Sequence, residues 1–279
     1  MVASPPPRTD PIAIAVAPNG ARRTKTDHPA LPITAAELAR TAAECLEAGA
    51  SMIHLHVRRP DGSHLLDPDA YRAATAAIRA EVGDRLVVQI TSEAAGLYSP
   101  DQQMAVVRSV RPEAVSLALR ELSQGDAAER SFIEFLDWIH RENILSQLIL
   151  YTPDEASRLS KLLQSGNLPF DDLPVLYVLG RYSAGQRSRP ADLLPFLAEG
   201  APRFGSWMAC AFGPDEIACV TAAALLGGDT RVGFENNIWL PDGSLAPSNA
   251  AAVAGAAEAL RRCGRTIARA DELRRRWRA

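Results

Sequence analysis

Two histidines separated by a single residue are the first candidates for chemistry in this chain of 279 residues, which contains only five histidines. His54 and His56 lie in the apolar stretch SMIHLHV (residues 51–57). Its composition is typical of a buried strand, and on a strand residues two apart point to the same face. Both imidazoles are therefore predicted to project together, as half of a metal site would require.

A carboxylate near the end of the chain could complete that site. In TRVGFENN (230–237), alternation places Arg231 and Glu235 on one face of a predicted strand. Two imidazoles and one carboxylate are a typical ligand set for a catalytic divalent metal and suit zinc. The plainer interpretation is that the histidines are hydrogen-bonded core residues and that Glu235 only pairs with Arg231. We favour the metal, because the paired histidines and the carboxylate occur together at strand ends.

The elements that must position these residues follow from eight short apolar runs that alternate with alanine- and leucine-rich stretches of helical period. The runs are IAIAVAP (12–18), SMIHLHV (51–57), RLVVQIT (85–91), EAVSLAL (113–119), LSQLILY (145–151), LPVLYVLG (173–180), SWMACAF (206–212) and TRVGFE (230–235). This alternation predicts parallel strands joined by crossover helices, and eight units predict a single-domain (β/α)₈ (TIM) barrel. An open doubly wound sheet is disfavoured, because APNGARRTK, after the first run, lacks GxGxxG. We expect the barrel at 12–279, after a flexible proline-rich segment at 1–11.

The predicted helices carry their own start signals. Thr34 with Glu37 and Thr152 with Glu155 have the spacing of capping boxes, while Asp67–Pro68 and Ser99–Pro100 pair an N-cap residue with a proline. The basic C-terminal stretch DELRRRWRA is most simply a solvated helix end, although a CoA phosphate could use it.

Further polar residues are predicted at the same end of the barrel, where the active sites of such barrels lie. Thr91 and Glu93 share a strand face and are candidate catalytic residues. Ser92, which begins the next loop, Ser116 on the fourth strand and Arg22 after the first strand are candidate substrate-binding residues. Arg22, together with Arg23 and Lys25, follows the first strand, and cations beside a metal indicate an anionic substrate. The simpler interpretation is that at least two of these three cations merely face solvent.

With these residues assembled, the sequence resembles the β-keto acid cleavage enzymes. The resemblance is carried by EAGASMIHLHVRRPDG, HPALPIT, VVQITS, VLG and RVGFENN followed by LPDGSLAPSN, in order over nearly the whole chain. It implies a zinc-bearing, homo-oligomeric (tetrameric or dimeric) barrel. Such an enzyme converts a β-keto acid and acetyl-CoA to acetoacetate and an acyl-CoA by Claisen addition, CoA transfer and retro-Claisen cleavage. It also implies zinc ligation by His54, His56 and Glu235, and contacts of Arg231, Thr91 and Ser116 with substrate.

Three departures from the family pattern bear on mechanism. The catalytic position after the metal glutamate is Asn236 instead of an aspartate, and an amide cannot accept a proton at neutral pH. Glu93 is then the nearest candidate base, because alternation along the third strand places it on the same face as Thr91. Arg22 and Ile149 stand where the family has carboxylates, so we expect the substituent R of the β-keto acid to be neutral or acidic rather than amino-bearing.

Two other functions remain open: a metal-dependent hydrolase or lyase on the same barrel, and a metal-binding barrel that binds β-keto acids without turnover. The net charge of −3 argues against a nucleic-acid partner. The longest apolar run, IACVTAAALL, is too short for a membrane span, and the N-terminus lacks the apolar core of a signal peptide. Four scattered cysteines, interpreted as core thiols, indicate a reducing compartment, so we expect the cytoplasm.

Overall fold

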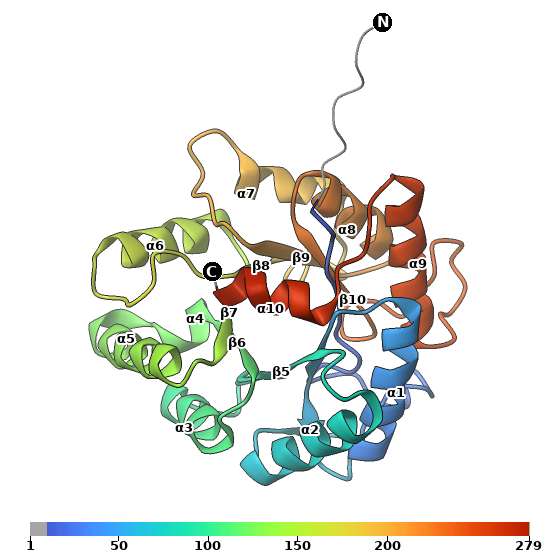
Figure 1. Ribbon diagram of the computed structural model, residues 1–279, viewed down its shortest axis with the longest axis horizontal. Coiled ribbons are helices and arrows are strands. Elements are labelled where there is room, and N and C mark those ends of the chain that lie inside the picture. The colour runs from blue at the N-terminus through green and yellow to red at the C-terminus, as the bar shows by residue number, and fades with distance from the viewer. Residues whose placement is uncertain (1–9, 279) are drawn as a thin grey trace, which may run out of the picture.

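Eight parallel strands close into a barrel in the computed structural model, which describes residues 10–278 (Figure 1). The strands are β1 (Ile14–Val16), β2 (Met52–Leu55), β5 (Val87–Thr91), β6 (Ala114–Ala118), β7 (Leu145–Leu150), β8 (Val175–Leu179), β9 (Trp207–Ala211) and β10 (Asp229–Val232). Their order around the barrel is β1-β10-β9-β8-β7-β6-β5-β2. Seven of them lie within predicted runs, and β10 overlaps the eighth run but begins one residue earlier, at Asp229. The predicted (β/α)₈ barrel is therefore confirmed. Of the expected flexible segment, residues 1–9 lie outside the described residues.

Helices surround the barrel and connect its strands. They are α1 (Ala35–Ala48), α2 (Pro68–Val82), α3 (Pro100–Val110), α4 (Leu119–Leu122), α5 (Gly125–Arg141), α6 (Pro153–Gln164), the 3₁₀ helix η1 (Pro190–Leu193), α7 (Leu194–Leu197), α8 (Glu216–Leu225), α9 (Asn249–Arg262) and α10 (Ala270–Arg278). A small antiparallel hairpin, β3 (Val57–Arg58) with β4 (His64–Leu65), follows β2. Among the described residues, no helix combines the length and apolar character needed to cross a membrane.

Alternation along the strands divides the core into two parts. Ile14, Val16 and Ile53 belong to the large cluster that packs against the surrounding helices. Ala15 and Met52, on the other face, belong to a second cluster inside the barrel. Both faces of every strand are covered, which explains why the strands appear in the sequence as nearly continuous apolar runs.

The helix starts follow the predicted caps with one difference. Thr34 and Glu37 form a complete capping box at α1, and Asp67 and Ser99 cap α2 and α3. Thr152 caps α6 by accepting a hydrogen bond from the Glu155 backbone N–H, but the reciprocal bond is missing. The Glu155 carboxylate instead pairs with Arg120 at 2.6 Å and accepts from the Tyr151 N–H.

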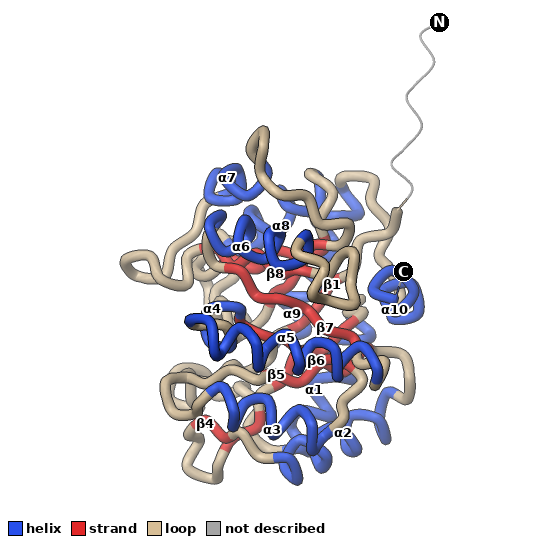
Figure 2. The backbone as a smooth tube through the Cα atoms, turned by 90° about the vertical axis from the view of Figure 1, so that its left-hand side faces the viewer, coloured by secondary structure: helices blue, strands red, loops and turns tan. Residues whose placement is uncertain are grey.

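The C-terminal helix α10 closes the end of the barrel opposite to the hairpin (Figure 2). Its Leu273 and Trp277 are buried against the cluster inside the barrel. Arg274 pairs with Glu113 at 2.6 Å and Arg276 with Asp229 at 3.1 Å. The basic stretch is therefore a packed cap rather than a solvated helix end. The prediction of four core thiols is wrong at one position, because Cys263, at the end of α9, is exposed while the other cysteines are buried.

Candidate active site

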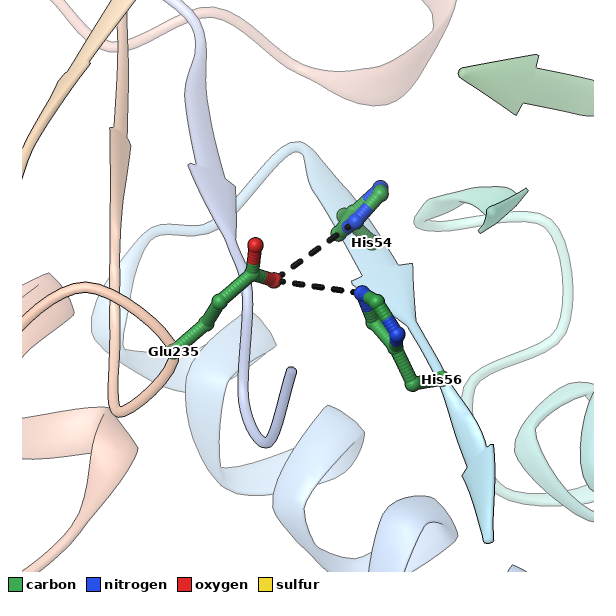
Figure 3. A group of neighbouring side chains, drawn as sticks. All are labelled: His54, His56 and Glu235. Atoms are coloured by element: carbon green, nitrogen blue, oxygen red, sulfur yellow. Dashed lines mark ion pairs between the residues drawn. The ribbon is translucent and has the colours of Figure 1, made fainter. Parts of the chain in front are cut away.

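The three predicted metal ligands converge on one point (Figure 3). His54 lies on β2, His56 directly follows it, and Glu235 lies in the turn after β10. The Glu235 Oε2 atom is 3.6 Å from His54 Nε2 and 3.5 Å from His56 Nε2. Ligand atoms in a tetrahedral zinc site with bonds of about 2.0–2.1 Å are roughly 3.3 Å apart. The side chains therefore need little movement to hold such an ion.

The protonation of these residues also suits a cation. Burial, opposed in part by Glu235, lowers the pKa of His54 to about 3, so its imidazole is neutral. Its Nδ1 donates to Gln89 Oε1 at 2.8 Å, which leaves Nε2 as the nitrogen with a free lone pair. Neither ring nitrogen of His56 nor the Oε2 of Glu235 has a hydrogen-bond partner among the described residues, although all are buried. Buried polar atoms without partners are costly, and a cation between His56 Nε2 and Glu235 Oε2 would satisfy those two atoms.

Glu235 reaches the site from a turn and not from a strand, which corrects the predicted run 230–235. The strand β10 ends at Val232, and the chain turns at Gly233, whose φ is +131°. A Cβ on Gly233 would lie 2.5 Å from the backbone oxygen of Ala17, so only glycine allows this approach to β1. The Glu235 N–H then donates to the same oxygen at 3.0 Å and fixes the direction of the side chain.

Arg231 and Asn236 lie beside Glu235. Arg231 donates through Nη2 to Glu235 Oε1 at 3.1 Å and to Asn236 Oδ1 at 3.2 Å. Burial would raise the pKa of Glu235, but the positive charge of Arg231 holds it well below the ordinary value. Asn236 is fully buried, its Nδ2 donates to Glu216 Oε1 at 3.4 Å, and it is not among the residues that line the cavity described next.

A cavity of about 410 Å³ opens at this point of the barrel. It is lined by His54, Thr91, Glu93, Ser116, Ala118, Ile149, Tyr151, Val178, Arg181, Phe212, Arg231 and Glu235. Of the predicted polar residues, Thr91, Glu93 and Ser116 are thus brought together. The Thr91 Oγ1 accepts from the Glu93 N–H at 3.0 Å and from Ser116 Oγ at 3.4 Å, so its own O–H can donate into the cavity.

The structure does not bring Ser92 and Arg22 into this cavity. The Ser92 hydroxyl is buried and donates to the Ser116 backbone oxygen at 3.1 Å, because adjacent strand residues point to opposite faces. Arg22 lines a second cavity of about 360 Å³, which shares Glu93, Arg181, Phe212 and Glu235 with the first. The two are therefore connected chambers of one site.

Sequence reasoning missed four residues of the site. Strand alternation puts Gln89 on the correct face but gives it no role. Tyr151 and Arg181 come after β7 and β8, and both line the cavity. The argument from strand ends that was applied to the histidines could have predicted them. Glu216, at the start of α8, resembles an ordinary helix N-terminal acid in sequence, yet it is 1% exposed and accepts from the Gly233 N–H at 3.1 Å.

Comparisons with known proteins find relatives that match nearly the whole chain. A 3-keto-5-aminohexanoate cleavage enzyme of Fusobacterium nucleatum is 30% identical over 94% of this chain and 96% of its own length. A 3-oxoadipate:acetyl-CoA acetyltransferase of Cupriavidus necator is 28% identical over 95% of this chain and 94% of its own length. The solved apo structure of ObcA superposes with a TM-score of 0.70 at 17% identity, covering 89% of this chain and 65% of that chain. This chain thus spans about two thirds of the length of ObcA, and the similarity between the two proteins is one of fold.

The model of one family, described as beta-keto acid cleavage enzyme, matches residues 11–278. That match includes both histidines, the turn that carries Glu235 and every strand of the barrel. The chain belongs to the β-keto acid cleavage enzyme family.

Proposed function

We propose that this chain is a zinc-dependent enzyme that converts a β-keto acid, with a neutral or acidic substituent R, and acetyl-CoA to acetoacetate and an acyl-CoA. Family membership makes it a carbon–carbon bond-cleaving acyltransferase. The observation that carries the zinc proposal is the convergence of His54 Nε2, His56 Nε2 and Glu235 Oε2, two of which are buried without hydrogen-bond partners among the described residues. Acetyl-CoA as the second substrate is supported by relatives whose names include it.

The reaction requires a proton to leave the carbon between the keto and carboxylate groups. That carbon then forms a bond to the acetyl carbon of acetyl-CoA as the thioester C–S bond breaks. The CoA sulfur takes up the R–CO group as the original carbon–carbon bond breaks, and a proton returns to the carbon of acetoacetate. Bound zinc would supply Lewis-acid polarisation of the keto and carboxylate oxygens, which acidifies the carbon between them.

Several residues would hold the reactants and move the proton. Glu93 is proposed as the base, because it lines the cavity and its Oε2 is 3.8 Å from His56 Nε2. Asn236 cannot accept a proton and would instead orient Arg231, to which it is hydrogen-bonded. Arg231 would hold negative charge on substrate and intermediates, and Thr91 and Ser116 would donate hydrogen bonds to their oxygens. The roles first predicted for Ser92 and Arg22 remain predictions, as do the homo-oligomeric state and the cytoplasmic location.

The test is acetoacetate formation from a panel of β-keto acids with and without acetyl-CoA. We expect turnover that requires acetyl-CoA, and a Glu93→Gln variant with kcat about 100-fold lower or worse, as for loss of a general base. Glu121→Gln is the matched control, because Glu121 accepts from the Ala94 N–H at 2.9 Å and does not line the cavity. Consumption of β-keto acid without acetyl-CoA would indicate the hydrolase or lyase instead, and binding without turnover would indicate a binding protein.

A further inference from the structure

Arg181 occupies the junction of the two chambers. It lies two residues after the end of β8 and lines both the chamber that contains His54 and the one that contains Arg22. Gly180, with φ of +73°, turns the chain before it, and a Cβ there would lie 2.7 Å from the backbone oxygen of Arg187. The backbone that presents Arg181 is therefore closely packed and fixed in direction.

Aromatic rings hold the guanidinium of Arg181 in place. Its central carbon lies 5.2 Å from the ring centroid of Phe212 and 5.6 Å from that of Tyr182. Stacking of this kind orients a guanidinium while leaving its N–H groups free to donate. Phe212 lines both chambers as well, so the stacked face of Arg181 belongs to the wall of the site.

The arginines at this junction form no direct ion pair. Within residues 10–278, neither Arg181 nor Arg22 has a carboxylate within ion-pair distance, although two acidic side chains also line the second chamber. Glu235 pairs with Arg231 at 3.1 Å, and Glu93 faces His56 at 3.8 Å. Arg23, the third arginine of the chamber, donates to the backbone oxygens of Phe234 and Asn236.

We propose that Arg181, assisted by Arg22, binds a second carboxylate at the far end of the β-keto acid, so that the preferred substrate is a dicarboxylic β-keto acid. This inference rests on the proposed function and narrows its substrate class. A substrate whose keto acid end lies at His54 has the apolar Ile149 and Val178 and the guanidinium of Arg181 in the wall of the same cavity. A guanidinium can donate two parallel hydrogen bonds to a carboxylate. A neutral substituent would leave both arginines without a partner, and an ammonium substituent would be repelled by them.

The experiment compares kcat/KM for 3-oxoadipate, for its neutral six-carbon counterpart 3-oxohexanoate and for 5-amino-3-oxohexanoate in the wild type, Arg181→Gln and Arg181→Lys. We expect the wild type to prefer 3-oxoadipate, and Arg181→Gln to lower kcat/KM for that acid by about tenfold or more, as for loss of a hydrogen-bonded charge pair. The value for 3-oxohexanoate and the KM for acetyl-CoA should stay within about twofold, and Arg181→Lys should retain part of the preference. Arg187→Gln, an exposed arginine of the same loop that lines neither chamber, should change nothing.

Two outcomes overturn the inference. Equal losses for the acidic and neutral acids together with a raised KM for acetyl-CoA would assign Arg181 to the phosphates of CoA. A wild type without preference for 3-oxoadipate would exclude a carboxylate subsite. Calorimetric binding of the same acids to the zinc-loaded protein distinguishes failure of the carboxylate-subsite inference from failure of the proposed function. Absence of turnover with selective binding of 3-oxoadipate, lost in Arg181→Gln, would reject the proposed reaction and still support the carboxylate subsite.

Discussion

A single hydrogen bond determines which nitrogen of His54 is free to bind a metal. The Oε1 atom of Gln89 can only accept, so the proton resides on His54 Nδ1 and Nε2 faces Glu235. The amide nitrogen of Gln89 donates to Gln147 Oε1 at 3.2 Å, which fixes the orientation of the glutamine. The histidines themselves could be predicted from the HxH spacing. Their partner could not be given its role, because the pairing of His54 with Gln89 across β2 and β5 depends on strand register.

Replacing Gln89 by leucine should therefore weaken zinc binding without removing a ligand. We expect an affinity about 10–100-fold lower, as for other residues that orient a metal-binding histidine. Gln89→Glu, which keeps an acceptor for Nδ1, should retain most of the affinity. Competition with a chromogenic chelator measures both, and an unchanged affinity in Gln89→Leu would show that this hydrogen bond does not orient His54.

Glu216 gives the stability of the fold a pH dependence. Burial raises its pKa to about 8 from an ordinary value of 4.5, despite hydrogen bonds from the Gly233 backbone and Asn236. Between these pH values the folded state keeps a proton that the unfolded state has lost. The contribution of Glu216 to the free energy of unfolding is therefore fully present below about pH 4.5, and it decreases as the pH rises toward about 8.

The Glu216→Gln variant should lack this component, because its amide does not titrate. Urea unfolding at several pH values from about 5 to about 8 should show a wild-type stability that falls with pH relative to that of the variant. The metal ligands are common to both proteins, so their pH dependence cancels in the difference. Parallel stability curves would mean that Glu216 is ionised in the folded protein.

At the scale of elements, two loops at the end of the barrel position Glu235. Parallel pairing of β1 with β10 brings the loop after β1 against the turn after β10. Gly20 in the first loop has φ of +60°, and a Cβ there would lie 2.6 Å from the Cγ of Glu235. The sequence predicted both strands and the loop cations, but strand phase could not predict the turn at Gly233, because it assumes an extended chain as far as Glu235.

Gly20→Ala should displace the metal-binding side chain of Glu235. We expect a loss of stability of about 1–2 kcal/mol from the left-handed backbone alone. We also expect zinc affinity to fall by about tenfold or more, comparable to loss of an orienting contact. Gly83→Ala is the matched control, because Gly83 has φ of +57° and no atom within 4 Å of the added Cβ. It should lose stability through its backbone conformation and keep its zinc affinity. Equal affinities in the two variants would contradict the role assigned to Gly20.

For the whole molecule, closure of the barrel is what joins residues 54–56 to residue 235. The strands β2 and β10 are far apart in sequence, but both pair with β1. Alternating apolar runs were sufficient to predict this topology, because each parallel strand is buried on both faces. They could not predict the packing of α10 under the barrel, since Arg274 and Glu113 meet only in the folded chain. They also could not show that Arg181 and Arg22 line one chamber.

The most direct test of the account is the zinc content of the protein purified without added metal, measured by elemental analysis in the wild type, His54→Ala and Glu235→Ala. We predict near-stoichiometric zinc in the wild type and its loss in both variants. Ser92→Ala, which removes a buried hydroxyl outside the cavity, should retain the metal. A wild type that contains no zinc and takes up none on addition would contradict the central claim, and the two histidines would then be core residues that merely face a carboxylate.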